Sequence, residues 1–209
     1  MKSLRRLSQR LLLAVSAAAL AIGATTAIFL TPPVVHILLR ASDAATLLEV
    51  EPRVAEALSD ALVWDLLTDG AFDIPLGDEP LLSARERSHL ADVGGLLRAV
   101  LAAGLGGLLV LTGAQLRRRA WLRAAIRDGA ALIVGGALLT AASFALAFDA
   151  TFAFFHGLFF VAGTWTFNPA TDRLVQLYPQ DFWVLAAMLF CLVLAVGSFT
   201  AYRLTARTR

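Results

Sequence analysis

The chain has few of the side chains on which many enzymes and secreted domains rely. Its 209 residues include one cysteine, Cys191, which excludes an intramolecular disulfide and a cysteine-rich metal centre. No Gly-x-Ser-x-Gly elbow, His-Glu-x-x-His motif or phosphate-binding glycine loop occurs. Charged residues make up only 16% of the chain and the net charge is +2, so we expect no nucleic-acid partner. These absences argue against a covalent acyl-enzyme, although a serine or threonine nucleophile stays open.

Long apolar segments are what the sequence has instead. Hydrophobic residues make up 58% of it, and four segments approach the roughly 20 residues that a helix needs to cross a bilayer. The sequence therefore predicts an all-α integral membrane protein, a single domain over residues 1–209. The expected spans are Leu11–Leu30, Gly94–Ala114, Ile126–Phe148 and Val184–Tyr202. Glycines within the spans predict close helix packing, at Gly104, Gly106, Gly107, Gly135 and Gly136.

The first span could also be interpreted as a cleaved signal peptide, because basic residues precede it. Its apolar run is long for a signal, and three more spans follow. We therefore expect the first span to be retained as a transmembrane helix.

Basic residues predict that both termini face the cytoplasm. They gather before the first span, in the link between the second and third spans, and at the end of the chain, which by the positive-inside rule are cytoplasmic positions. The members are Lys2, Arg5, Arg6 and Arg10, then Arg117, Arg118, Arg119, Arg123 and Arg127, then Arg203, Arg207 and Arg209. Residues 31–93 and 149–183 would then face outward as a small extracytoplasmic cap.

The outer loop 31–93 is too long and too patterned to be a simple connector. Pro32 and Pro33 mark a turn after the first span. Apolar residues at near-helical spacing predict an amphipathic helix over Val50–Leu67 that ends at Thr68-Asp69-Gly70. Its apolar face is expected to hold Val54, Ala57, Leu58, Ala61 and Leu62.

The end of this loop leads into the second span. Gly77-Asp78 indicates a short hairpin within Ala71–Leu82. Ser83 and Glu86 have the spacing of a capping box, which predicts the start of a helix. This helix would continue through His89 and Asp92 into the second span, with both side chains on one face.

The three histidines all fall on the predicted outer side. We interpret His36, which has apolar neighbours, as structural. His89 has acidic neighbours, and His156 lies within a run of phenylalanines that suits the water–lipid boundary. Two such histidines at outer helix ends favour general acid–base catalysis on a substrate that brings its own nucleophile.

A zinc site is the alternative for the same two histidines. A carboxylate such as Asp92 or Asp172 could complete it, but no strong ligand spacing supports it, so we expect no metal ion.

Two stretches of the sequence resemble a known family. Glu86–Val93 leads into a span, and Phe154–Phe160 follows one; the second stretch continues through Trp165, Phe167, Asn168, Pro169, Asp172 and Leu177–Trp183. Together they are similar to the lipoprotein intramolecular transacylases, small four-span membrane enzymes of bacteria. The resemblance implies that the sn-2 acyl chain of a diacylglyceryl lipoprotein moves to the α-amino group of its N-terminal cysteine, which yields a lyso-form lipoprotein. The family's two catalytic histidines fall on His89 and His156.

The expected enzyme is a monomer of the bacterial cytoplasmic membrane with its active site on the outer face, in contact with membrane lipid and without a cofactor. The residues expected to bind the lipoprotein are Asp92, Phe155, Trp165, Asn168, Asp172, Arg173 and Tyr178. Arg173 is the only cation of its loop, and we expect it to pair with Asp149, Asp172, Asp181 or a headgroup phosphate. The alternative function is a non-catalytic four-span protein that binds lipid or an envelope partner through its aromatic outer loop.

Overall fold

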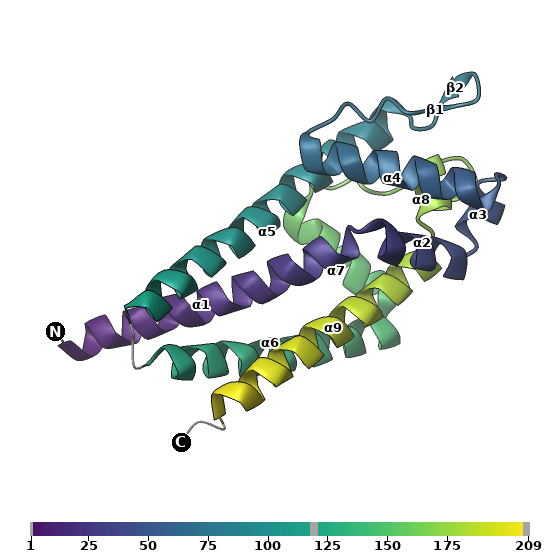
Figure 1. Cartoon of the computed structure of the whole chain (residues 1–209). Coiled ribbons are helices and arrows are strands. Elements are labelled where there is room, and N and C mark those ends of the chain that lie inside the picture. Colours follow the sequence, from purple (N-terminus) through teal and green to yellow (C-terminus); the bar gives the residue numbers. More distant parts are fainter. Residues whose placement is uncertain (1, 118–120, 207–209) are drawn as a thin grey trace. The chain divides into compact units, whose positions relative to one another are not determined.

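Four long helices dominate the chain. The computed structural model describes residues 2–117 and 121–206, so the basic residues Arg118, Arg119, Arg207 and Arg209 lie outside the described residues. The long helices are α1 (Lys2–Phe29), α5 (Ala84–Leu116), α6 (Leu122–Leu146) and α9 (Gln180–Ala206) (Figure 1). Each contains a stretch that is long and apolar enough to cross a membrane, which confirms the four predicted spans.

Contacts divide the chain into two compact units. The first contains Met1–Ala27, Ala99–Ala142 and Leu189–Arg209, and the second contains Ile28–Arg98 and Ser143–Met188. Both candidate histidines, His89 and His156, belong to the second unit, so the candidate site is described within that unit alone.

Helices of the first unit approach one another through small residues. A Cβ atom added to Gly104 of α5 would lie 2.9 Å from the Cα of Gly23 in α1, and one added to Gly129 of α6 would lie 2.8 Å from the Ala14 carbonyl oxygen. The prediction of close packing is therefore confirmed for Gly104, and Gly107 likewise faces the Ser16 carbonyl. The prediction was wrong for three other glycines, because an added Cβ would meet no described atom within 4 Å at Gly106, Gly135 and Gly136.

The second unit is built on short helices that follow α1. They are α2 (Pro32–Ala41), α3 (Ala44–Leu47) and α4 (Pro52–Thr68), which pack on one another (Figure 1). The predicted Pro32-Pro33 turn is the start of α2, because proline fits the first turn of a helix, where its missing N–H is not needed. The helix predicted over Val50–Leu67 is α4, and Asp69 in the left-handed region (φ 60°) ends it where predicted.

The buried face of α4 differs from the predicted one by about one residue. Leu58 and Leu62 are buried as expected, but Val54 and Ala57 are exposed, and the close-packed positions are taken by small side chains. The buried apolar and hydroxyl residues of α4 are Ala55, Leu58, Ser59, Leu62 and Leu66. Ala55 and Ser59 are small and completely buried, and hydrophobicity alone does not mark such positions.

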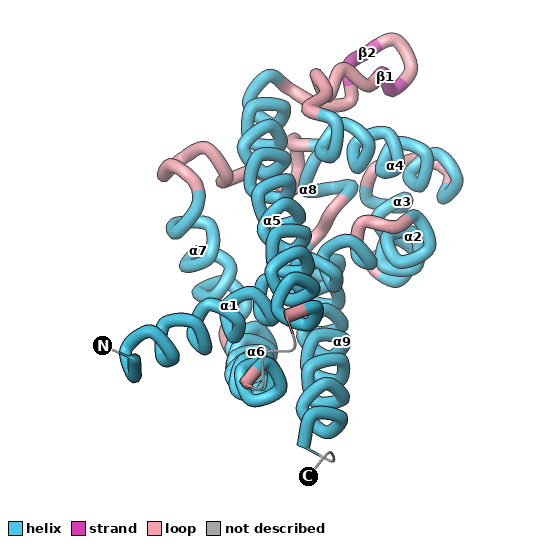
Figure 2. The backbone as a smooth tube through the Cα atoms, turned by 60° about the vertical axis from the view of Figure 1, so that its left-hand side comes forward, coloured by secondary structure: helices cyan, strands magenta, loops and turns pink. Residues whose placement is uncertain are grey.

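The predicted hairpin is confirmed between α4 and α5. Strands β1 (Pro75–Leu76) and β2 (Glu79–Pro80) pair antiparallel, with Leu76 opposite Glu79, and Figure 2 shows them as the short magenta segments. Leu81 and Leu82, directly after the hairpin, are almost completely buried in the core of the second unit. The hairpin thus leads the chain back into the core immediately before α5 begins.

Residues 149–183, predicted as a loop, contain two helices. The third long helix ends at Leu146, two residues before the predicted end, and Ala147 leaves the helical conformation (φ −150°, ψ 61°). Helix α7 (Phe148–Phe159) follows at once, and α8 (Arg173–Leu177) comes after an irregular segment, residues 160–172. The phenylalanine run of α7 has no polar face, so hydrophobic periodicity gave no signal of this helix.

Candidate active site

The capping box at the start of α5 positions His89. The Glu86 N–H donates to Ser83 Oγ at 3.3 Å, and the Ser83 N–H donates to Glu86 Oε2 at 2.7 Å, which confirms the predicted motif. One turn later, His89 is only 7% exposed. The position of this imidazole is therefore set by a well-capped helix end.

His156 is positioned by α7 and by a hydrogen bond to its own helix. His156 Nδ1 lies 2.8 Å from the carbonyl oxygen of Phe152. A carbonyl only accepts hydrogen bonds, so Nδ1 carries the proton and Nε2 keeps a free lone pair. Burial lowers the pKa of His156 below its ordinary value of 6.5, although the bond to Phe152 opposes the shift. The ring is therefore neutral at pH 7 and Nε2 can accept a proton.

The two imidazoles face each other between α5 and α7. Their ring centroids are 6.0 Å apart and their planes are inclined by 30°. Phe160 bridges them, since its ring centroid lies 5.0 Å from that of His89 and 5.5 Å from that of His156. The structure thus brings together the two histidines that the sequence singled out, at a separation at which both can touch one substrate group.

Other aromatic rings enclose the pair. The ring of Trp165 lies 4.9 Å from that of His156, and the ring of Phe167 lies 5.5 Å from that of His89. Phe155, which is partly exposed, meets His156 edge-on at 5.5 Å. Such rings make a water-poor environment in which polar interactions are stronger than in bulk water.

Two polar atoms at this site lack a hydrogen-bond partner. They are His89 Nδ1 and Trp165 Nε1, which are both buried, and no group of the described residues bonds to either. A buried donor or acceptor without a partner costs about 1–3 kcal/mol. Such atoms are rare in folded proteins and mark places where a ligand or water is expected to bind.

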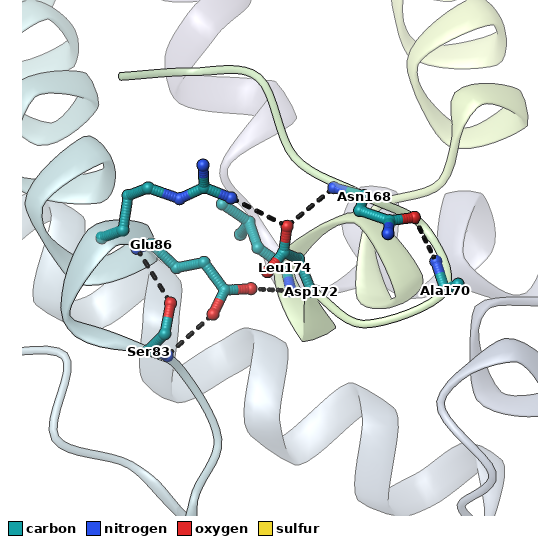
Figure 3. A network of polar contacts seen from close by, with 7 residues as sticks. Ser83, Glu86, Asn168, Ala170, Asp172 and Leu174 are labelled. Carbon is teal, nitrogen blue, oxygen red and sulfur yellow. Dashed lines mark hydrogen bonds and ion pairs between the residues drawn. The ribbon is translucent and has the colours of Figure 1, made fainter. Parts of the chain in front are cut away.

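A polar network ties the segment 160–172 and α8 to the start of α5 (Figure 3). The second carboxylate oxygen of Glu86, Oε1, accepts the Leu174 N–H at 2.7 Å. Asp172 Oδ2 accepts the Asn168 N–H at 2.7 Å and the Arg85 Nη2–H at 3.0 Å. The Arg85 guanidinium also lies 4.8 Å above the ring of Phe167. The network therefore holds the residues around Trp165 against the helix that carries His89.

Several of the residues predicted to bind substrate contribute to this framework. Asp172 and Asn168 shape the segment itself, and Asn168 Oδ1 accepts the Ala170 N–H at 3.0 Å (Figure 3). Tyr178 lies in the core, where its hydroxyl meets Ser59 Oγ at 2.7 Å and burial raises its pKa to about 12. Asp92 is exposed on α5, three residues beyond His89.

The aspartates predicted to pair with Arg173 were wrong, and pairing with a headgroup phosphate stays a prediction. Arg173 Nη2 donates to Glu79 Oε2 at 3.0 Å and its Nη1 donates to the Pro80 carbonyl at 3.3 Å, so it pairs with strand β2 instead of with an aspartate of its own loop. The charges within one loop could not indicate this pairing, because Glu79 lies 94 residues away from Arg173 in the sequence.

His36 has the structural role that the sequence indicated. Its Nε2 lies 2.9 Å from Asp60 Oδ1 and its Nδ1 lies 3.8 Å from Glu56 Oε2, so it links α2 to α4. Among residues 2–117 and 121–206, no three His, Cys, Asp or Glu side chains gather closely enough to hold a metal ion.

Residues that sequence reasoning did not assign complete the site. Phe160 and Phe167 stand in the stretches that resemble the transacylases, yet no pattern showed that their rings would touch the histidines. Glu86 was predicted as a helix cap, and its second bond, to Leu174, could not be foreseen without the fold.

Comparisons with known proteins agree on one group. A family model described as lipoprotein intramolecular transacylase Lit matches residues 63–183. The structure of the membrane-integral lipoprotein intramolecular transacylase Lit from Bacillus cereus is similar with a TM-score of 0.77 at 20% identity, over 99% of this chain and 96% of that chain. Two variants of that protein, with one histidine replaced by arginine or by alanine, each give a TM-score of 0.75 at 20% identity. The alignments cover 98% of this chain and 92% and 93% of theirs. No curated protein sequence gave a significant match. The matched residues 63–183 include both histidines of the pair.

Proposed function

The chain belongs to the lipoprotein intramolecular transacylase family, and we propose that it moves the sn-2 acyl chain of a diacylglyceryl lipoprotein to the α-amino group of the lipoprotein's N-terminal cysteine. The amine nitrogen attacks the ester carbonyl carbon and forms the C–N bond. The tetrahedral intermediate then collapses, the bond to the sn-2 oxygen breaks, and that oxygen takes a proton. The products are an amide and a free sn-2 hydroxyl, so no water, cofactor or acyl-enzyme is consumed or formed.

The enzyme's first task is to fold the substrate onto itself. The attack closes a ring of roughly eight atoms, and holding the two ends together removes much of the entropic barrier. The aromatic rings around the histidines, with Phe160 beside both, support this role because they restrict the headgroup to a small space.

Its second task is proton transfer. Most of an α-amine with a pKa near 8 is protonated at neutral pH, and the nitrogen must lose a proton as it attacks. Nε2 of His156 is the base in this proposal, because Nδ1 is held as a donor by Phe152 and the pKa of the ring is lowered. His89, across the 6.0 Å pair, stabilises or protonates the departing sn-2 oxygen.

The observation that carries this function is the facing pair of histidines within a buried aromatic setting. We place the pair at the outer face of the cytoplasmic membrane, at the level of the lipoprotein headgroup. The distribution of basic residues supports this orientation, since Arg117 directly follows α5, at the opposite end of that helix from His89, and Arg123 and Arg127 lie in the first turns of α6.

The test is a reaction of the purified protein with a synthetic diacylglyceryl peptide in lipid nanodiscs. Mass spectrometry of fragments would locate the acyl chain before and after the reaction. We expect transfer to the amine by the unaltered protein, and a rate lower by on the order of 10²–10⁴-fold after His89→Ala or His156→Ala. The double variant should be little slower than the slower single variant, because both residues serve one step.

His36→Ala is the matched control, since His36 is a histidine of the same unit that bonds to Asp60. It should keep the rate, as should addition of a chelator. Full turnover by His156→Ala would contradict the acid–base proposal, and loss of activity with chelator followed by recovery with zinc would favour the metal alternative. Binding of the peptide without any transfer would favour the non-catalytic lipid-binding alternative.

A further inference from the structure

The indole nitrogen of Trp165 is a hydrogen-bond donor held beside the proposed base without a partner. It is one of three buried side-chain polar atoms that no group of the described residues bonds. The second, His89 Nδ1, also belongs to a ring that faces His156, whereas the third, Ser198 Oγ, lies within α9 in the first unit. Both unpartnered atoms of the second unit thus belong to rings around His156.

The chemistry of indole limits what the missing partner can be. An indole N–H only donates, so its partner must be an acceptor such as a carbonyl oxygen or an oxyanion. No group of the described residues accepts a hydrogen bond from this N–H, not even the ring of His156, whose centroid lies 4.9 Å from that of Trp165. The acceptor is therefore expected to come from the substrate.

Resting on the proposed function, we infer that the Trp165 N–H donates to the carbonyl oxygen of the ester that is being transferred. As the amine attacks, the electron pair of the C=O double bond moves onto this oxygen, and the resulting negative charge strengthens the bond from Trp165. When the intermediate collapses, the double bond returns and the bond between the carbonyl carbon and the sn-2 oxygen breaks. Trp165 neither gains nor loses a proton, so it complements His156, which receives the proton from nitrogen.

Two features of the structure suit Trp165 to this task. Its ring lies 4.9 Å from that of His156 and is inclined by 35°, so a substrate group held by His156 lies next to the indole. The segment that carries it is fixed by the bonds from Asn168 to Asp172 and from Arg85 to Asp172. A donor that is fixed in advance in a water-poor site stabilises a developing charge without reorganisation at the moment of reaction.

Trp165→Phe is the direct test, because it keeps an aromatic ring near His156 and removes the N–H. In the nanodisc assay we expect kcat to fall on the order of 10²–10³-fold, the usual loss for one oxyanion donor, with KM little changed. The variant also loses one ring of the indole and its packing, so the melting temperature serves only to show that the variant is folded, and kcat decides the inference. Trp183→Phe is the matched control: Trp183 is partly exposed and its ring lies 6.5 Å from that of Phe152, and it should keep the full rate.

The outcomes separate this inference from the proposed function. If the unaltered protein transfers no acyl chain, the proposed function itself is wrong. If the unaltered protein and Trp183→Phe are active and Trp165→Phe is equally active, the function stands and the role of Trp165 is wrong.

Discussion

In the proposed mechanism, proton transfer depends on a main-chain carbonyl. His156 Nδ1 donates to the Phe152 oxygen four residues earlier in α7, so the helix itself selects which nitrogen of the ring is free. Burial then disfavours the charged form and lowers the pKa of the ring. A half-buried histidine on an apolar helix is thereby kept neutral at the pH at which an α-amine still has to lose its proton.

This arrangement predicts the pH dependence of the reaction. His156 must be neutral to accept a proton, so activity is lost as pH falls through its lowered pKa, below 6.5. The substrate amine must also be neutral, and its pKa is near 8. The logarithm of kcat/KM should therefore rise with slope two below the pKa of His156 and with slope one between the two values.

The control is the residual activity of His156→Ala, measured over the same pH range. It should rise with slope one throughout, because only the substrate amine still titrates. A slope of one down to low pH in the unaltered protein would contradict the assignment of His156 as the base.

Individual residues differed in how well the sequence predicted them. His89 and His156 could be selected because histidine is scarce in the chain and both lie near expected helix ends. The partners of Tyr178 and Arg173 could not be predicted, since Ser59 and Glu79 lie 119 and 94 residues away in sequence. Contacts of that range are products of the fold, and a single sequence has no local pattern that encodes them.

At the level of elements, Glu86 connects the start of α5 to α8. It is 2% exposed, and its two carboxylate oxygens accept the Ser83 and Leu174 N–H groups at 2.7 Å each. Without this carboxylate the buried Leu174 N–H would be unpaired, whereas Ser83 is exposed, so water could replace its bond. The same residue thus starts the helix that carries His89 and holds the end of the segment that carries Trp165.

Replacing Glu86 should therefore affect both stability and rate. We expect Glu86→Ala to lose about 1–3 kcal/mol for the Leu174 N–H left unpaired, and to lower kcat because Trp165 and Phe167 are no longer held. Glu86→Gln keeps one acceptor oxygen, so its melting temperature and kcat should lie between those of the unaltered protein and of Glu86→Ala. Melting temperature in nanodiscs and the acyl-transfer assay are the measurements.

Glu79→Ala is the appropriate comparison, because Glu79 makes an exposed ion pair with Arg173 and should contribute little to stability. Equal melting temperatures for Glu86→Ala and Glu79→Ala would show that the buried carboxylate does not connect the two elements.

Most elements followed from local sequence rules, and the exceptions have a physical cause. The capping box, the stop of α4 and the hairpin depend on neighbouring residues and were predicted correctly. Helix α7 was missed because only Asp149, Thr151 and His156 of its twelve residues are polar, too few to give a helical period. The buried face of α4 was misplaced because the small residues Ala55 and Ser59 are buried, which a hydrophobicity pattern does not indicate.

At the level of the whole molecule, the distribution of charge predicts which parts face outward. Cys191→Ala gives a cysteine-free background, and we expect it to keep full activity because no step of the proposed reaction uses a thiol. In that background, Asp78→Cys at the tip of the β1–β2 hairpin should react with a membrane-impermeant maleimide in intact cells. Arg117→Cys, at the end of α5, should react only after the cells are opened. Labelling of Arg117→Cys in intact cells would overturn the proposed orientation.

Helix α7 makes the second unit depend on its surroundings. No residue of α7 is buried, and Phe154 and Leu158 are 68% and 62% exposed, so in the proposed membrane setting we expect hydrocarbon to cover the side of the helix that the protein leaves open. In a membrane, neighbouring acyl chains would then exclude water from His156, as a protein core does in a soluble enzyme. The reaction rate is therefore expected to depend on the length and order of those chains. A rate measured in a short-chain detergent should differ from one measured in a bilayer.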